Sequence, residues 1–272
     1  MLDSRFSGVV SELAGRWSLR IGERFPPTPG TPGNFVAPVV RANGSSAVLK
    51  ISNYIHETRA EIAALSLWNG NGAARILAAD ADLGALLLER IEPGAMLASV
   101  QDEDDTVRIT ADVLRQLWQP LPASDHGLRS LDDWCAAYDR VPEFLKSIPL
   151  LWRADALRRQ LLTSTVQPVA LHGDMHHFNV LRSNRAGWLA IDPKGLAGDR
   201  HFDVCQFLRN PGPVSIAVNR RRLDLFSDLL DLDRQRLSQW CLVHAVLDVC
   251  WSYEEGQDWR PALTYAEATL SL

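Results

Sequence analysis

The secondary-structure pattern of this 272-residue chain changes once, at Glu92-Pro93-Gly94. Before this point short β-rich runs surround one helical segment, whereas after it long amphipathic helices dominate. A chain of this length exceeds the usual size of one domain but is short for two independent ones. We therefore predict one compact α+β protein of two lobes, residues 1–92 and 93–272.

The first lobe is expected to be a small antiparallel sheet with one helix, preceded by an amphipathic helix within residues 1–20. The prolines and glycines of residues 25–33 exclude a helix or a central strand and require a loop. The helix of the lobe is expected over residues 56–68, ended by the Asn-Gly repeat that follows. The strands are expected at residues 35–40, 47–51, 74–77 and 85–91, with the first two joined by a turn at Asn43-Gly44.

The second lobe is expected to be mostly helical. Its helices are predicted at residues 103–118, 131–146 and 152–164, and again from about residue 203 to the end. Ser130 and Asp133 have the spacing of a capping box at the start of the second of these helices. Two short apolar strands, at 168–172 and 187–192, interrupt the helices and flank a polar loop.

Charge and composition exclude several classes of protein. The formal net charge of -5 and the isoelectric point near 5.8 argue against a nucleic-acid-binding protein. The N-terminus lacks the layout of a signal peptide, and no apolar run reaches the roughly 18 residues of a membrane span. The four cysteines form no CxxC pair, which predicts buried free thiols in a reducing compartment. We expect a soluble, cytoplasmic protein.

The polar loop and the strand after it carry the residues with the most informative spacing. Asp174 follows an apolar strand, Asn179 comes five residues later, and Asp192 ends the next strand. We expect these three oxygen-bearing side chains to meet at one end of a hairpin. One carboxylate and one amide suit Mg²⁺, which prefers oxygen ligands and keeps waters and substrate phosphates in its shell. The remaining carboxylate, Asp174, could then receive the proton of an attacking hydroxyl.

The order His-x-Asp-x-x-x-x-Asn followed by Asp resembles the catalytic loop and metal-binding aspartate of the kinase superfamily. His-Gly-Asp-Met-His-His-Phe-Asn with Ile-Asp-Pro-Lys-Gly-Leu-Ala-Gly is similar to the aminoglycoside phosphotransferase branch, especially the streptomycin 6-kinase and hydroxyurea phosphotransferase group. The resemblance spans nearly the whole chain. It implies a protein-kinase-like two-lobed fold and transfer of the γ-phosphoryl group of ATP or GTP, with Mg²⁺, to a hydroxyl of a small molecule such as streptomycin.

The resemblance also assigns roles to single residues. Asp174 would be the catalytic base or hydroxyl-orienting group, with Asn179 and Asp192 as magnesium ligands. Lys50 would hold the α- and β-phosphates. Its partner would be Glu61, with Glu57 one helical turn earlier as the alternative. Glu89 and Ile91 would belong to the hinge at about 89–94, which meets the nucleotide base. His172 and Asp203 would support the catalytic loop. Gly33 and Asn34 would belong to the phosphate loop, whose sequence departs from GxGxxG.

Several alternatives stay open at the level of sequence. His172, His176 and His177 could indicate a zinc-dependent hydrolase, but an HxxxH pair needs a helix and this segment is a strand end and a loop. Asp203 could equally be a helix N-cap. The segment from Trp251 to Trp259 could border the acceptor pocket or merely anchor a helix end. The protein could also be a catalytically silent nucleotide-binding module, or a kinase whose acceptor is hydroxyurea, a sugar or an amino alcohol. It could be a monomer or a small homo-oligomer.

Overall fold

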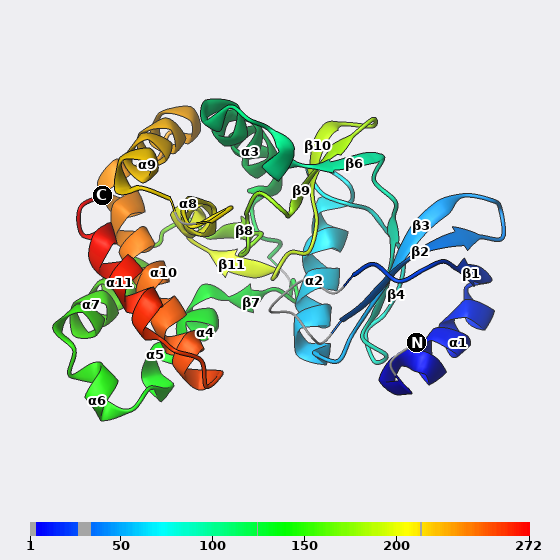
Figure 1. Cartoon of the computed structure of the whole chain (residues 1–272), viewed down its shortest axis with the longest axis horizontal. Coiled ribbons are helices and arrows are strands. Elements are labelled where there is room, and N and C mark those ends of the chain that lie inside the picture. Colours follow the sequence, from blue (N-terminus) through cyan, green and yellow to red (C-terminus); the bar gives the residue numbers. More distant parts are fainter. Residues whose placement is uncertain (1–3, 27–33, 124, 213) are drawn as a thin grey trace.

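A computed structural model of the protein describes residues 4–26, 34–123, 125–212 and 214–272. Figure 1 shows a β-sheet with α1 and α2 at one end of the molecule and most of the remaining helices at the other. Of the predicted loop at 25–33, residues 27–33 lie outside the described residues, and Gly33 is one of them. The two-lobed, kinase-like α+β architecture is confirmed.

The first lobe is built on a five-stranded antiparallel sheet in the order β1-β2-β3-β5-β4. Its strands are β1 (Leu19–Ile21), β2 (Asn34–Arg41), β3 (Ser46–Ser52), β4 (Ile76–Asp80) and β5 (Ala85–Glu89). The β2–β3 hairpin is confirmed, and Gly44 in its turn has a positive φ of 82° that suits glycine. The short helix predicted within residues 1–20 is α1 (Ser4–Arg16), which ends before Ser18, whose φ of 52° turns the chain into β1.

Two helices cover opposite faces of this sheet, because side chains of a strand alternate between its faces. Ala85 and Leu87 of β5 join the core formed with α1, whereas Leu86 and Leu88 join the core formed with α2 (Ile55–Trp68). The second of these cores is continuous with the interior of the helical lobe. The α2 helix is therefore held between the sheet and the rest of the molecule, where it can connect the two lobes.

The second lobe contains the predicted helices with one correction. The predicted helix at 131–146 is three short helices, and the last break occurs because Val141 before Pro142 is forced into extended backbone. The Ser130 cap is confirmed, since its Oγ accepts the Asp133 N–H at 3.0 Å. The helices are α3 (Glu103–Leu117), α4 (Leu131–Cys135), α5 (Ala137–Arg140), α6 (Glu143–Lys146), α7 (Pro149–Thr163), α8 (Cys205–Leu208), α9 (Ile216–Leu230), α10 (Arg234–Glu254) and α11 (Arg260–Thr269), with the 3-10 helices η1 (Leu97–Ser99) and η2 (Arg200–Val204).

Two small three-stranded sheets are formed by short strands of residues 93–198, within the second lobe, and carry the loops of interest. One has the order β10-β9-β6 and the other β7-β11-β8. Their strands are β6 (Pro93–Met96), β7 (Arg129–Ser130), β8 (Val169–Leu171), β9 (Val180–Ser183), β10 (Gly187–Ala190) and β11 (Leu196–Gly198). The two predicted strands correspond to β8 and β10, but they do not pair with each other: β10 pairs with β9, and β8 pairs with β11.

None of the helices in the described ranges is long and apolar enough to cross a membrane. All four cysteines are buried free thiols.

Candidate active site

Lys50 forms the electrostatic centre of the candidate site. It lies on β3, is 7% exposed, and donates to both carboxylate oxygens of Glu61 on α2, at 2.8 and 2.7 Å. It also contacts the carboxylate of Asp192, 142 positions later in the chain. Glu61, rather than Glu57, is therefore the structural partner of Lys50; Glu57 Oε2 lies 3.6 Å from the ammonium of Lys194.

The charges in this cluster are strongly coupled. Burial would raise the pKa of Asp192, but the ammonium groups of Lys50 and Lys194 more than offset it and hold that pKa well below its ordinary value. Burial would lower the pKa of Lys50, but the carboxylates of Asp192 and Glu61 more than offset this effect and hold that pKa above its ordinary value. The carboxylates of Glu61 and Asp192 share the Lys50 ammonium, and burial raises the pKa of Glu61 to about 7 against the effect of Lys50. Lys50 is thus charged and Asp192 ionised at neutral pH.

The β9–β10 hairpin places Asn179 and Asp192 at the same end. Val180 pairs with Ala190 in the ladder, and the Ile191 N–H donates to the Asn179 carbonyl at 2.9 Å. Asp192 has a φ of 59°, a left-handed backbone that costs a non-glycine residue about 1–2 kcal/mol. The expected hairpin exists, but its two ends carry only Asn179 and Asp192, while Asp174 arrives from β8.

Asn179 and Asp192 fit the oxygen ligands of a hard divalent cation. The side-chain nitrogen of Asn179 donates to the Asp174 carbonyl at 2.9 Å, so its Oδ1 is the atom that can face a cation. The ionised carboxylate of Asp192 supplies the second oxygen donor, with its side chain 43% exposed. One amide oxygen and one carboxylate match the few protein ligands that Mg²⁺ commonly takes beside phosphates.

Asp174 follows β8 and lies in a more open position than Lys50. Gly173 before it has a φ of 80°, and an added Cβ there would come within 2.8 Å of the Leu196 side chain. The Asp174 carboxylate lies 3.7 Å from Nε2 of His176, and the Gln206 side chain acts to lower the pKa of this carboxylate. Burial raises the pKa of Asp174 above its ordinary value, which makes the carboxylate a better proton acceptor.

Asp203 holds the backbone that presents Asp174. Its Oδ1 accepts the Gly173 N–H at 2.7 Å, and its Oδ2 accepts the His172 N–H at 2.9 Å and the Trp118 indole N–H at 3.1 Å. Burial raises the pKa of Asp203 to about 6, against the opposing effect of these donors. The cap of η2 is Asp199, which accepts the N–H of His201, so Asp203 supports the loop and does not cap that helix.

His172 has both ring nitrogens engaged within the protein. Its Nδ1 accepts the Asp174 N–H at 3.2 Å, so Nε2 carries the proton and donates to the Ile191 carbonyl at 2.9 Å. Burial lowers the pKa of His172 to about 4. The His177 ring is buried and stacks on Phe207 with ring centres 4.0 Å apart. The zinc interpretation fails on this geometry, and no three His, Cys, Asp or Glu side chains of the described residues are placed to hold a metal.

The expected hinge residues lie where the two lobes meet. The Glu89 carboxylate accepts from the Arg185 guanidinium, with Nη2 to Oε1 at 2.6 Å, and Arg185 also donates to the carbonyls of Gly70 and Ala73. Glu89 thereby ties the β9–β10 turn to the first lobe through its side chain. Ile91 is half-buried just before β6. Their expected contact with a nucleotide base stays a prediction.

Asn34, the described residue of the expected phosphate loop, begins β2. Its carbonyl accepts from Arg24 at 2.6 Å, and its side-chain Oδ1 is buried without a hydrogen-bond partner in the described structure. A role for Asn34 in holding phosphate stays a prediction.

The segment from Trp251 to Trp259 is anchored by packing at the end of α10. Trp251 lies edge-on to Trp134, with ring centres 5.3 Å apart, and Glu254 accepts from Arg140 at 2.6 Å. A contact with the acceptor stays a prediction.

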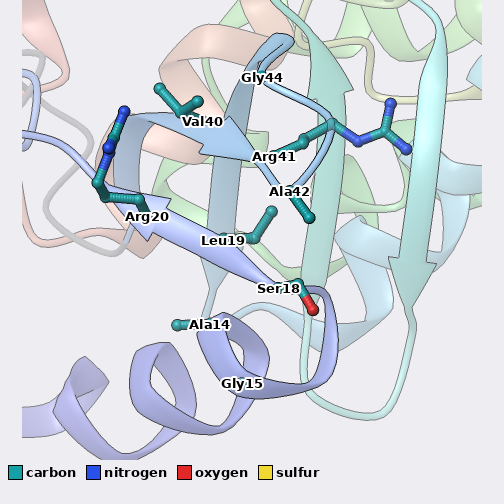
Figure 2. Close-up of a pocket in the computed structure, with 9 residues that line it drawn as sticks. All are labelled: Ala14, Gly15, Ser18, Leu19, Arg20, Val40, Arg41, Ala42 and Gly44. Carbon is teal, nitrogen blue, oxygen red and sulfur yellow. The ribbon is translucent and has the colours of Figure 1, made fainter.

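A surface hollow of about 620 Å³ lies away from these residues, between α1, β1 and the β2–β3 turn. Figure 2 shows that its two arginines, Arg20 and Arg41, point in different directions. None of the candidate site residues lines it. We therefore assign it no part in the chemistry.

Two residues of the site were missed by the sequence reasoning. Gln206 on α8 is reached only through the fold. Lys194 lies two positions after Asp192, so its place in the sequence motif could have indicated that it belongs to the site. Burial would lower the pKa of Lys194, but Asp192, Asp174 and Glu57 raise it, so this side chain is a second ammonium beside the carboxylates.

The two-lobed fold, with a strand lysine paired to a helix glutamate and an Asp–Asn–Asp set beyond it, defines a small-molecule phosphotransferase of the kinase type. The fold resembles that of choline kinase from Streptococcus pneumoniae, with a TM-score of 0.69 at 14% identity, covering 99% of this chain and 100% of that one. More specifically, the chain belongs to the aminoglycoside/hydroxyurea antibiotic resistance kinase family, whose model matches residues 20–256.

Two curated relatives are similar over nearly the whole chain. A streptomycin 6-kinase from Streptomyces glaucescens is 35% identical, covering 97% of this chain and 87% of the relative. A hydroxyurea phosphotransferase from Kitasatospora aureofaciens is also 35% identical, covering 97% of this chain and 78% of the relative. The resemblance to this group is confirmed, and with it the assignment as a kinase that phosphorylates a small molecule.

Proposed function

We propose that this protein transfers the γ-phosphoryl group of ATP to a hydroxyl of a streptomycin-like aminoglycoside and so inactivates the antibiotic. The observation that supports the chemistry is the Lys50–Glu61–Asp192 cluster, with Asp174 on the neighbouring loop. The similarity to a streptomycin 6-kinase over 97% of the chain supports the acceptor. GTP as an alternative donor is left for experiment, because base recognition at the hinge would use backbone groups.

The proposed roles follow from the charges at each position. Lys50, buried and ionised, binds the α- and β-phosphates, while Glu61 holds its ammonium in place. Asp174 orients the acceptor hydroxyl and receives its proton as the oxygen attacks phosphorus in line. Asn179 and Asp192 would hold Mg²⁺, which supplies charge neutralisation to the phosphates when bound. Asp203 and His172 keep the loop that carries Asp174 in its conformation.

We further propose that residues 1–92 form the nucleotide-binding lobe and residues 93–272 the lobe with the acceptor site. Lys50 and Glu61 belong to the first lobe, whereas Asp174, Asn179 and Asp192 belong to the second. A cytoplasmic location and a monomer or small homo-oligomer remain part of this proposal.

Hydroxyurea is the second candidate acceptor, because a hydroxyurea phosphotransferase matches the chain with the same identity. A silent nucleotide-binding module is disfavoured, since Lys50, Asp174, Asn179 and Asp192 are all in place.

An acceptor panel tests the proposal. Purified protein with Mg²⁺ and either ATP or GTP is assayed for nucleoside diphosphate release with streptomycin, hydroxyurea, choline and a hexose, and phosphorus NMR locates the phosphorylated oxygen. We expect streptomycin-dependent release from the wild type and a rate at least about 10²-fold lower from Asp174→Ala. Release that requires hydroxyurea instead would assign the second candidate, and no acceptor-dependent release with any member would contradict both.

A further inference from the structure

Lysine is rare in this chain, and its placement is uneven. Of the 28 cationic residues counted as lysine and arginine, only Lys50, Lys146 and Lys194 are lysines. Lys146 lies on the surface in α6, with its side chain 40% exposed, whereas the other two lie beside the site carboxylates. Both side chains bind phosphate, but an ammonium does so as a compact point charge, whereas a guanidinium binds carboxylates and phosphates as a planar, bidentate fork. A chain that uses arginine almost everywhere else thus places two of its three ammonium groups in one site.

The backbone holds Lys194 in a defined position. Its N–H donates to the His172 carbonyl at 2.7 Å, directly before the loop that carries Asp174. The next residue, Gly195, has a φ of 62°, and an added Cβ there would come within 2.2 Å of the Ala60 carbonyl oxygen. The segment is therefore pressed between the end of β8 and the α2 helix, so Lys194 is not carried by a loose loop.

The two ammonium groups differ in how much of their bonding capacity is used. Lys50 Nζ contacts both oxygens of Glu61 and one of Asp192, which engages its three N–H donors. Among the described residues the ion pair of Lys194 is a longer one, at 3.6 Å to the half-exposed carboxylate of Glu57. Asp192 and Asp174 both act on the Lys194 charge electrostatically. This geometry therefore leaves Lys194, two positions after Asp192, with a long ion pair, so its ammonium has donors available for a ligand.

The loop that presents Asp174 offers no lysine or arginine of its own. The residues between Asp174 and Asn179 are Met-His-His-Phe, of which Met175 is fully buried. The γ-phosphoryl group must pass between the base and the metal ligands, and its equatorial oxygens carry the negative charge of the transition state. A fixed cation is needed at that place, because the transfer depends on positioning and electrostatic stabilisation.

We propose that Lys194 is a catalytic residue whose ammonium binds the transferred phosphoryl group. The acceptor oxygen forms a bond to phosphorus, its proton passes to Asp174, and the bond from phosphorus to the bridging oxygen breaks with its electron pair leaving on the diphosphate. Lys194 stays protonated throughout and moves from Glu57 to an oxygen of the phosphoryl group. This inference rests on the proposed kinase function, and it adds a specific contact to the γ-phosphate.

The test compares Lys194→Met and Lys194→Arg with the surface control Lys146→Met. Calorimetric titration with Mg²⁺ measures the affinity for ADP and for a non-hydrolysable ATP analogue, which differ by the γ-phosphate, and steady-state assays measure kcat. Thermal melting checks that each variant is folded; if the methionine variant is not, Lys194→Gln replaces it.

We expect Lys194→Met to weaken binding of the ATP analogue about 10-fold while changing ADP affinity less than about twofold, and to lower kcat about 10²- to 10³-fold. Lys194→Arg should recover part of the analogue affinity, and Lys146→Met should match the wild type. Equal losses for both nucleotides, or no loss for either, would overturn the inference. Wild-type protein that binds the analogue but phosphorylates no acceptor would refute the proposed function alone, because the nucleotide comparison would still decide the contact of Lys194.

Discussion

At the scale of single residues, the two aspartates of the candidate site have different electrostatic environments. Asp174 has a raised pKa, whereas Asp192 has a lowered one, because Asp192 contacts Lys50 directly and Asp174 does not. Pairs of titratable groups whose environments move their pKa values apart are typical of active sites. The environment therefore supports Asp174 as the proton acceptor and Asp192 as the permanent anion.

Replacing Asp174 with asparagine keeps the shape of the side chain and removes the proton acceptor. We expect kcat to fall about 10²- to 10⁴-fold, with little change in the affinity for an ATP analogue, because nucleotide binding is assigned to other residues. In the wild type, activity should decline as acidification protonates Asp174, at a pH above the ordinary range of an aspartate.

Steady-state kinetics and calorimetric titration check these outcomes, with the exposed Asp228→Asn on α9 as a control for charge loss. Turnover of Asp174→Asn close to that of the control would rule out Asp174 as the base.

At the scale of elements, the position of the site depends on how closely α2 packs against the segment after Asp192. Gly195 allows this approach, since any side chain there would meet the Ala60 carbonyl. The same helix carries Glu61 to Lys50. The contact thus helps to set the distance between Lys50 of one lobe and Asp192, the proposed metal ligand, of the other.

Two glycines with positive φ allow this contact to be tested. Gly187, the first residue of β10, has a φ of 75° and open space around it, so Gly187→Ala should cost only the backbone strain of about 1–2 kcal/mol. Gly195→Ala adds a clash with backbone, and we expect a loss of about 2–5 kcal/mol in the free energy of unfolding. Equilibrium denaturation with guanidinium chloride measures both. Similar losses in the two variants would mean that α2 moves aside without cost.

Helices and strands with a long sequence pattern could be predicted, and very short ones could not. The β2–β3 hairpin and α3 have clear periodicity, α2 is ended by the Asn-Gly repeat, and all three were predicted. β1, β6, β9 and β11 have three or four residues each, too few for a period to be recognised, and they exist because a partner strand is nearby. Pro142 indicated a break in the predicted helix at 131–146, but the prediction followed helical periodicity alone.

At the scale of the whole molecule, the large core contains a titratable group whose protonation opposes folding. His244 on α10 is 3% exposed and packs against Phe202 and Trp251. Burial lowers its pKa to about 3, whereas the unfolded chain has a histidine pKa of about 6.5. The native protein keeps this ring neutral while the unfolded chain binds a proton below pH 6.5. Its contribution to stability is therefore fully present above pH 6.5 and is lost as the pH falls towards 3.

The variant His244→Phe isolates this effect from the other titrating groups. Relative to the variant, the wild type should lose about 1.4 kcal/mol of unfolding free energy per pH unit between about pH 6 and 4. Denaturation curves at a series of pH values measure the difference, and both proteins are compared at pH 7.5 for the cost of the substitution itself. Parallel pH dependence of the two proteins would show that His244 does not titrate on unfolding.

The amino-acid sequence by itself determined the two-lobed pattern and the order and spacing of Lys50, Asp174, Asn179 and Asp192, because short motifs and periodicity act over local distances. The tertiary structure decided what depends on residues far apart in the chain. It selected Glu61 over Glu57 as the partner of Lys50, assigned Asp203 to the loop backbone, and placed Lys194 beside Glu57 of α2. Neighbouring positions on one helix are equivalent in sequence, and only packing against a second element makes one of them buried and paired.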